Sequence, residues 1–365
     1  MLADPSLERI FRFFLPHACL EQAAQCAEGN INRTWIVEFF SGSNSSRSRE
    51  KAVLQRLSPA VFPDPPAVMA NFRIITRHLA QQKGMGLLPA VFPRAYSNPD
   101  GNDFFIDAAG GLWRLISYIG PARTLMQVNA RQAAAAGRML AHFHLLLRCL
   151  SPEEIRDPLP GFHDTPQYLA RFDAICRKRG PKNQDEEWCF TCIEQLRPLA
   201  GLLQSNAGQH ARQLVHADPK CSNFLFAQES DEALSLIDLD TVRFSFLLHD
   251  LGDCLRSCCN QGGEERGSDP HFDQSCFTAL LAAYLEAGGK ALLSGQDQAL
   301  LLEATRLHIF ELGLRFFTDH LEGNPYFICR YPGQNLDRAE VQFKLHASLL
   351  AQENQLRSEL ARLLA

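Results

Sequence analysis

The sequence predicts a mixed α+β fold with two lobes, a small first lobe built on an antiparallel sheet and a larger, helical second lobe. Short runs of alternating apolar residues, separated by turn-forming residues, fill the first part of the chain. Gly120 and Pro121 interrupt this pattern, and most segments beyond them have the apolar spacing of helices. The 365 residues are also too many for one simple core. We therefore expect one lobe over residues 1–119 and a second over 120–365.

The first lobe is expected to contain two helices and several strands. The run LERIFRFFL within residues 1–28 is typical of a helix, and four apolar residues of 67–82 fall on one helical face. A small polar turn at 41–46 joins the first two strands. The expected strand segments, the first of which begins with a turn, are 29–40, 52–57, 87–94, 104–108 and 113–119.

The second lobe is expected to be helical apart from one pair of strands. The segments with helical spacing are 129–150, 165–179, 184–203, 272–287, 296–322 and 337–363. The exception lies within residues 214–253, where the apolar runs 224–226 and 234–237 indicate two short antiparallel strands. Carboxylates stand at the ends of both runs, so acidic groups are expected to gather there.

Composition excludes several classes of function. The net charge of −5 argues against a nucleic-acid partner, and no apolar run reaches the roughly 18 residues of a membrane helix. Acids precede the apolar part of the N-terminus, which argues against an export signal. The twelve cysteines are therefore expected to be reduced thiols of a cytoplasmic protein. The lone CxxC pair, Cys189 and Cys192, is interpreted as packed helix thiols rather than a zinc site.

The polar loop that begins at His216 carries the candidate chemistry. His216, Asp218 and Asn223 have the spacing H-x-D-x-x-x-x-N, which is the catalytic-loop pattern of kinase-type phosphotransferases. The short pattern alone would arise often by chance. Its combination with Asp238 and Asp240 after the second apolar run is much rarer, and it favours a metal-nucleotide site.

Phosphoryl transfer needs a group that meets the acceptor hydroxyl and positive charge that offsets the moving phosphate. Asp218 is predicted to be the base or positioning group for the acceptor. Lys220 is predicted to point its ammonium group into the site, and His216 is predicted to support the catalytic loop.

Metal ions must also bridge the phosphates. Asn223 and Asp238 are predicted to hold Mg²⁺, which prefers oxygen ligands with few carboxylates. Asp240 is either a further metal contact or an acceptor behind the metal site. Asp250 and Asp253 stand where a helix should begin. Capping of that helix and bracing of the loop is one interpretation of both residues, and it is the favoured interpretation of Asp253.

The segments HADPKCSNFLF, IDLDTV and HDLGDCLRS together resemble the aminoglycoside phosphotransferase and choline kinase-like superfamily, and most closely the N-acetylhexosamine 1-kinases. Further similar segments follow the same order along the chain: GNINRT at 29–34, VLQR at 53–56, VFPDP at 61–65, GFHDT at 161–165 and ELGLRFFTDHLEGNPYF at 311–327. The resemblance covers residues from about 29 to 345 and implies a two-lobed protein-kinase-like fold.

The resemblance implies ATP and Mg²⁺ as cofactors and the anomeric hydroxyl of an N-acetylhexosamine as the acceptor. It would place Arg56 at the nucleotide phosphates. The other residues that it would place at the nucleotide are Asn32, Thr34, Ser117, Tyr118 and Ile119, the last three in the hinge that meets adenine. The residues that it would place at the sugar are Asn30, Arg315 and Tyr326.

Several positions depart from the family pattern. Residues 29–34 lack a full glycine-rich loop, and Asn30 stands where the family often has histidine. Segment 67–82 has no acid to pair with Arg56, and Ala217 and Pro219 replace an asparagine and a threonine. These departures keep open a kinase of the same fold for an aminoglycoside, choline or another amino alcohol.

Two alternatives come from other classes. A regulator that binds nucleotide without turnover would be expected to lack Asp218 or Asp238, and both are present. A metal-dependent hydrolase would need more histidines near the carboxylates, whereas His142 and His144 are interpreted as packing or capping residues of a helix.

Overall fold

The computed structural model describes residues 5–26, 32–42, 48–59, 61–84, 90–205, 207–265 and 269–365. The chain divides into two compact units, Met1–Leu87 with Val91–Gly120 and Leu88–Ala90 with Pro121–Ala365. The first contains an antiparallel sheet and the second is mostly helical, which confirms the predicted α+β class. Among the described helices, none is both long and apolar enough to cross a membrane.

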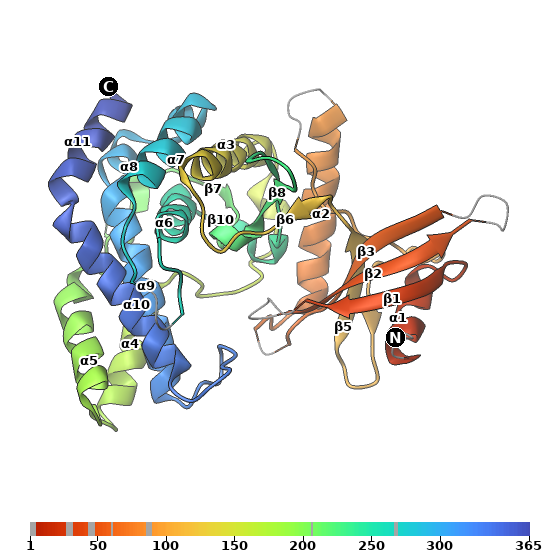
Figure 1. Cartoon of the computed structure of the whole chain (residues 1–365), viewed down its shortest axis with the longest axis horizontal. Helices are drawn as coiled ribbons and strands as arrows, with labels where there is room; N and C mark the ends of the chain where they lie inside the picture. Colours follow the sequence, from red (N-terminus) through yellow and green to blue (C-terminus); the bar gives the residue numbers. More distant parts are fainter. Residues whose placement is uncertain are drawn as a thin grey trace. The chain divides into compact units, whose positions relative to one another are not determined.

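The first unit is built on a five-stranded antiparallel sheet with the order β1-β2-β3-β5-β4 (Figure 1). The strands are β1 (Cys19–Gln25), β2 (Arg33–Ser41), β3 (Ser48–Arg56), β4 (Phe105–Ile106) and β5 (Leu112–Ser117). Trp35 of β2 pairs with Leu54 of β3, which pairs with Leu115 of β5. This register fixes which side chains share a face of the sheet, because successive residues of a strand point to opposite faces.

One face of this sheet is covered by α1 (Pro5–Phe14). The buried cluster between helix and sheet consists of Leu7, Ile10, Phe11, Phe14, Val37, Phe39, Ala52, Leu54, Trp113 and Leu115. The alternation places Thr34, Gln55 and Arg114 on the opposite face. There the guanidinium of Arg114 lies 4.8 Å from the ring of Phe72 in α2 (Pro65–Gly84). The two faces therefore have different helical neighbours.

The apolar face predicted for residues 67–82 is confirmed. Val68, Phe72, Ile75 and Leu79 of α2 are all buried. Because these residues recur at three- and four-residue intervals, they form one stripe along the helix.

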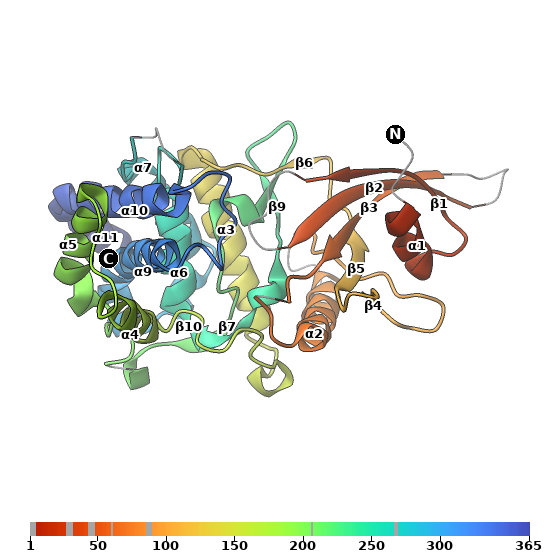
Figure 2. The same ribbon diagram turned by 90° about the horizontal axis from the view of Figure 1, so that it is seen from below.

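The second unit is organised around the buried helix α9 (Leu301–Leu321), which packs against α4, α6 and α10. Figure 2 shows α10 on one side of α9 and α4 on the other. Besides α9, the described α-helices of this unit are α3 (Ala130–Leu147), α4 (Thr165–Cys176), α5 (Gln184–Leu196), α6 (Leu247–Cys258), α7 (Gln274–Glu286), α8 (Gly295–Ala299), α10 (Gln334–Ala351) and α11 (Glu353–Leu364).

Two small sheets in the second unit carry the loop that begins at His216. One has the order β6-β8-β9, and β7 and β10 pair antiparallel in the other. The strands are β6 (Ala122–Arg123), β7 (Arg212–Val215), β8 (Phe224–Ala227), β9 (Ala233–Leu236) and β10 (Arg243–Phe246). The predicted strand pair is thus confirmed as β8 and β9, but strands β6, β7 and β10 were not predicted. They are only two to four residues long, which is too short for a periodic pattern to appear.

The sequence interpretation of the first unit was wrong in two places. Cys19–Gln25 forms β1, because it pairs with β2 over nearly its whole length and tertiary pairing outweighs its weak strand propensity. Residues 90–94 form no strand, and Ala95 makes only an isolated bridge to Ile116. Pro93 has no N–H for a sheet ladder, which is one physical reason. Asn30, most of the turn at 41–46, and residues 87–89 lie outside the described residues.

Two long helices predicted for the second unit are each divided. Segment 296–322 is α8 and α9, which meet at Leu300, and segment 337–363 is α10 and α11, which meet at Gln352. The apolar spacing continues across both junctions, so periodicity alone could not reveal the breaks.

Candidate active site

The candidate catalytic loop lies between β7 and β8, and hydrogen bonds join it to the end of β9. The backbone oxygen of Asn223 accepts from Ile237 N at 2.9 Å, and His216 Nε2 donates to Ile237 O at 2.9 Å. Asp238 follows with a left-handed backbone, φ 66°, which turns the chain sharply. The chain therefore returns at Asp238 toward the loop, and the charge of Asp238 acts on Lys220.

Asp218, Lys220 and Asn223 form one hydrogen-bonded group. Lys220 Nζ lies 2.6 Å from Asp218 Oδ2, and Asn223 Nδ2 donates to the same oxygen at 3.1 Å and to the backbone oxygen of Asp218 at 2.8 Å. The side chain of Asp218 is 22% exposed, so an acceptor hydroxyl can reach it. Burial opposes the charge of Lys220, but the carboxylates of Asp218 and Asp238 outweigh burial and raise the pKa of Lys220. Lys220 is therefore a cation beside Asp218.

His216 is fully buried and supports the loop. Its Nδ1 accepts from Asp218 N at 3.2 Å, while its Nε2 donates to Ile237 O. Burial lowers the pKa of His216, which agrees with a neutral ring that has one donor and one acceptor. His216 thus fixes the backbone of Asp218 and holds no charge there.

The two carboxylates after β9 differ in exposure. Asp238 is half-buried, whereas Asp240 is 2% exposed and lies in the turn Leu239–Thr241. Thr241 in that turn donates to His216 O at 2.8 Å. Asp238 is therefore the more accessible of the two carboxylates for a metal ion, whereas Asp240 and Asn223 are buried.

Asp250 braces the loop from inside α6. Its two carboxylate oxygens accept from His216 N and Ala217 N, both at 2.7 Å, and one also lies 2.8 Å from His144 Nε2. Burial raises the pKa of Asp250, but the hydrogen bond and charge of His144 outweigh it, so the net shift is downward. Asp250 is thus a buried carboxylate that binds two consecutive backbone N–H groups.

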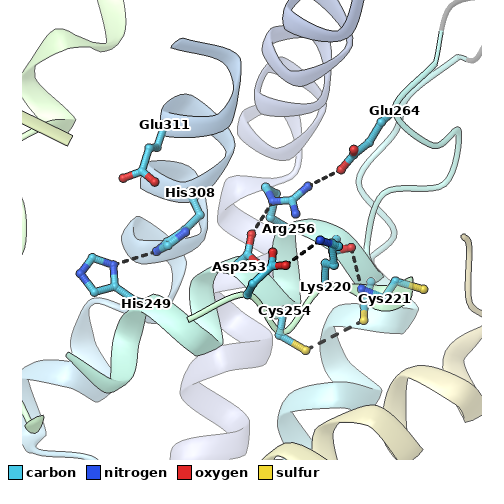
Figure 3. Close-up of polar contacts among 12 residues, drawn as sticks. Lys220, Cys221, His249, Asp253, Cys254, Arg256, Glu264, His308 and Glu311 are labelled. Carbon is cyan, nitrogen blue, oxygen red and sulfur yellow. Dashed lines mark hydrogen bonds and ion pairs between the residues drawn. The ribbon is translucent and has the colours of Figure 1, made fainter. Parts of the chain in front are cut away.

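The capping role favoured for Asp253 was wrong, and Asp250 is not a cap either. Helix α6 begins at Leu247 after Phe246, so both aspartates lie within the helix. Asp253 binds Arg256 at 2.8 Å, and Arg256 reaches Glu264 at 2.8 Å (Figure 3). Bracing of the loop therefore belongs to Asp250.

A cavity of about 230 Å³ lies within the second unit, and Phe162 of its lining is followed by His163, which contacts Ala217 of the loop. Its lining residues are Leu159, Pro160, Gly161, Phe162, Gln167, Tyr168, Arg171, Arg315, Thr318, Asp319, Glu322, Tyr326 and Phe327. The predicted sugar residues Arg315 and Tyr326 thus share one cavity. The Asp218 carboxylate contributes to the raised pKa of Arg315, because its charge reaches that guanidinium. Burial is the largest influence on that pKa and opposes the shift.

Arg315 lies among aromatic rings in this cavity. Its guanidinium carbon is 5.1 to 5.6 Å from four ring centroids, those of Phe162, Tyr168, Tyr326 and Phe327. Within the described residues no carboxylate comes within ion-pair distance of Arg315. The cavity therefore combines apolar ring faces with one guanidinium that forms no ion pair there.

The two acids of the cavity already have partners. Asp319 accepts from Tyr326 N at 2.9 Å and Phe327 N at 3.0 Å. Glu322 forms a two-bond ion pair with Arg171. Both carboxylates thus hold the walls of the cavity in place.

The predicted nucleotide residues of the first unit lie on both faces of the sheet. Thr34 Oγ1 accepts from Gln55 Nε2 at 3.1 Å on the α2 face. Arg56 lies on the α1 face, where its Nε donates to Asp107 at 3.2 Å. The structure therefore does not bring Arg56 and Thr34 together.

The other predicted nucleotide residues lie near the sheet ends. Asn32 Oδ1 accepts from Ser58 N at 3.0 Å, and Ser117 Oγ accepts from Arg94 N at 3.0 Å. The ring of Tyr118 lies 5.7 Å from Lys51 Nζ, and Ile119 is half-buried.

Sequence reasoning missed His163 and Glu311. His163 Nδ1 lies 2.7 Å from Glu311 Oε1, and its Nε2 lies 2.7 Å from the backbone oxygen of Ala217. Each residue stands in a segment already recognised as similar to the sugar kinases, GFHDT and ELGLR, and these segments were the available signal. Their separation of 148 positions hid the contact.

Comparisons with known proteins give the family and the fold of the chain. The profile of the phosphotransferase enzyme family matches residues 22–297. The structure of a microcompartment-associated aminopropanol kinase is 16% identical, with a TM-score of 0.60 over 99% of this chain and 100% of that one. The choline kinase of Cryptosporidium parvum is 12% identical, with a TM-score of 0.58 over 94% and 92%. The GDP complex of aminoglycoside 2'-phosphotransferase-IIIa is 13% identical, with a TM-score of 0.54 over 98% of each. These likenesses confirm the kinase-like fold.

Proposed function

The chain belongs to the phosphotransferase enzyme family, and on this premise we propose that it transfers a phosphoryl group from ATP, with Mg²⁺, to the anomeric hydroxyl of an N-acetylhexosamine. It is a small-molecule kinase that acts on an alcohol group. The GDP bound to one similar structure supports a nucleotide as the donor.

The loop residues take the roles that their geometry allows. Asp218 accepts the proton of the acceptor hydroxyl or orients that hydroxyl, and Lys220 offsets negative charge beside it. Asn223 and Asp238 would hold Mg²⁺, which supplies positive charge to the phosphates when bound. Their donor set, one amide oxygen and one carboxylate, suits a hard cation that keeps water and phosphate oxygens as its other ligands.

The position of Arg315 carries the proposal of an uncharged acceptor. A quaternary or primary ammonium group is commonly bound by a cage of aromatic rings. In this cavity the rings of Phe162, Tyr168, Tyr326 and Phe327 already surround Arg315. A cationic acceptor would meet a like charge, whereas a sugar can pack its C–H face on a ring and accept a hydrogen bond from the guanidinium. The acetamido oxygen of an N-acetylhexosamine is such an acceptor.

The size of the cavity also favours a single sugar. At about 230 Å³ it is smaller than the roughly 300–1,000 Å³ of pockets that hold drug-sized ligands. A multi-ring aminoglycoside would extend into a second pocket of about 530 Å³ that shares Tyr326 and Phe327, and it would bring several ammonium groups to Arg315.

A screen of ATP consumption tests the proposal. The acceptors are N-acetylglucosamine, N-acetylgalactosamine, the parent hexoses, an aminoglycoside, choline, ethanolamine and aminopropanol. We expect turnover with the N-acetylhexosamines and none with their 1-O-methyl glycosides, because the reacting hydroxyl is then blocked. Turnover only with the amines, or equal turnover of the blocked glycosides, would overturn the sugar 1-kinase proposal. The Asp218→Asn variant controls for contaminating kinases.

A further inference from the structure

The backbone of Ala217, just before Asp218, is held from both sides by buried side chains. Asp250 accepts its N–H, and His163 Nε2 lies 2.7 Å from its carbonyl oxygen. Ala217 and His163 both have left-handed backbones, with φ 67° and 60°. Such conformations are costly for residues other than glycine and persist where the surroundings fix them. Two strained residues thus meet at one hydrogen bond next to Asp218.

The partners of His163 determine its protonation. A carbonyl oxygen can only accept a hydrogen bond, and an ionised carboxylate can only accept as well. Glu311 Oε2 accepts from Thr165 Oγ1 at 2.5 Å, and Glu311 Oε1 faces His163 Nδ1. Burial opposes the charge of both groups, but the charge and hydrogen bond of each partner outweigh it, so the pKa of Glu311 is lowered and the pKa of His163 is raised. The pair is therefore ionised together. Both ring nitrogens of His163 must therefore carry hydrogen, which makes the ring an imidazolium.

We propose that the His163 imidazolium, shared between Glu311 and the carbonyl of Ala217, is a positioning residue that presents Asp218 to the acceptor. Glu311 and Arg315 are four residues apart on α9 and therefore lie on one helical face. The same face of α9 thus anchors the base loop through His163 and lines the acceptor cavity with Arg315. This inference rests on the proposed role of Asp218, but on no particular acceptor.

A metal ion is the competing explanation for this cluster. Ligand atoms of His163, His249 and His308 lie within 4.8 Å of one another, and all three side chains are buried. The bonds argue against a metal, because both His163 nitrogens already face acceptor oxygens, and His249 Nδ1 lies 3.1 Å from His308 Nε2 (Figure 3). That short contact joins two neutral rings, one donor and one acceptor. Burial lowers the pKa of both His249 and His308.

The variant His163→Gln tests the inference, with His308→Gln as the matched control from the same buried cluster. Loss of the contacts that His163 makes with Glu311 and Ala217 is expected to reduce kcat roughly 10- to 100-fold, because small misplacement of a reacting group has effects of this size. KM for ATP should change by less than about twofold, and the control should keep at least half of the wild-type kcat. The acceptor is whichever compound the wild-type enzyme uses. A kcat of His163→Gln equal to that of the control would overturn the inference.

Nitrogen NMR of the histidine rings gives a readout that needs no turnover. The His163 signal, assigned by its absence in His163→Gln, should be that of an imidazolium at neutral pH, while His249 and His308 should be neutral. The titratable groups that influence the pKa of His163 are the carboxylates Asp253 of α6 and Glu311 of α9 and the rings of His249 and His308. A neutral His163 ring, or a stoichiometric metal ion in the wild-type protein that the variant lacks, would overturn the inference. Absence of any acceptor in the screen would instead count against the proposed function.

A second inference comes from the sheet of the first unit. On the α2 face, Ile36, Val53 and Ile116 stand side by side on three adjacent strands. A second row, parallel to the first, is formed by Thr34, Gln55 and Arg114. Each of them lies two positions along its strand from a residue of the apolar row, so the two rows are about 7 Å apart. The polar row is continuous, because Gln55 donates to Thr34 and accepts from Arg114 at 3.0 and 2.8 Å.

We infer that the nucleotide lies against this α2 face and that Arg114, rather than Arg56, supplies positive charge to its phosphates. The α1 face cannot take a ligand, since the buried cluster of α1 fills it. On the other face α2 covers only the Arg114 end of the polar row, through Met69 and Phe72, whereas Thr34 and Gln55 are half-buried and can be reached. An apolar row next to a polar row matches a nucleotide, whose flat base is followed by a polyanionic tail. Arg114 is 1% exposed and acts from beneath Gln55, so its role is that of a positioning residue. This inference rests on the proposed use of ATP.

Calorimetric titration of ATP and ADP tests it. Arg114→Met is expected to weaken ATP binding about tenfold or more, whereas Arg56→Met should change it less than about twofold. Gln55→Glu tests the same face if the buried methionine variant does not fold, since it neutralises Arg114 through an ion pair and should also weaken ATP binding. Unchanged affinity in Gln55→Glu, or a larger loss in Arg56→Met than in Arg114→Met, would overturn the inference. A wild-type protein that binds neither nucleotide would count against the proposed function instead.

Discussion

The Asp218 loop and the α2 face of the sheet both present polar side chains, but different forces hold them. Around the loop, Asp250 and His163 reach backbone groups from elements distant in sequence. On the sheet, the row of Thr34, Gln55 and Arg114 follows from strand register. Few side chains determine the loop conformation, whereas many backbone hydrogen bonds determine the register. Single substitutions around the loop should therefore have larger effects than substitutions in the row.

The largest expected effect belongs to Asp218. Asp218→Asn removes the proton acceptor while it keeps the size of the side chain, so kcat should fall by at least about 10²- to 10⁴-fold. Nucleotide affinity and the free energy of unfolding should stay near their wild-type values, because the buried supports of the loop are intact. Steady-state kinetics together with ADP titration measures both. Turnover above one tenth of the wild-type value would remove Asp218 from the role of base.

The next largest effect is expected from Asp250, the carboxylate that holds the backbone of the loop. Asp250→Ala leaves two buried backbone N–H groups and His144 without their carboxylate, and we expect a loss of about 3–5 kcal/mol in the free energy of unfolding. Denaturant unfolding followed by circular dichroism measures this loss. A loss below about 1 kcal/mol would show that water or other groups replace the carboxylate easily.

The same contrast explains what the sequence could predict. Asp218, Asn223 and Asp238 could be named as candidates because they lie within one short stretch of recognisable spacing, and the structure joins the loop to the end of β9. The contact of His163 with Glu311 could not be predicted, since the two residues are 148 positions apart and the recognised segments GFHDT and ELGLR do not reveal that they meet. Only tertiary packing of α9 brings them together.

In the sheet, the prediction of Arg56 at the nucleotide phosphates differs from our inference of Arg114 for another reason. Gln55 and Arg56 are neighbours in β3, so they point to opposite faces. The alternation of a strand predicts that the two side chains lie on opposite faces of the sheet, but it does not tell which of these faces a helix covers. That depends on where α1 packs, and α1 is connected to β3 only through two intervening strands.

The pH dependence of stability should separate the two regions further. The pKa of Asp250 is lowered, so its contribution is present above the unfolded value of about 3.9 and is lost as pH falls through the lower folded value. The pKa of His163 is raised, because Glu311 outweighs the opposing effect of burial. Its contribution is present below about 6.5 and is lost as pH rises through the folded value.

Unfolding free energies measured across the pH range would test this expectation. The alkaline loss should disappear in His163→Gln, and the acid loss should be smaller in Asp250→Asn. The variant Thr34→Val in the polar row of the sheet should leave both slopes as they are in the wild-type protein, because neither side chain titrates. An alkaline slope that persists in His163→Gln would assign that slope to another group.

The smallest effect is expected in the row itself. Thr34→Val removes one partly buried hydrogen bond, that from Gln55, and keeps the branched shape that suits a strand. The free energy of unfolding should fall by about 0.5–1.5 kcal/mol, several times less than for Asp250→Ala, and kcat should be nearly unchanged. If the phosphates lie over this row, KM for ATP should rise modestly while KM for the acceptor stays the same. A loss of stability as large as that of Asp250→Ala would mean that the row, and not the strand register, holds this face together.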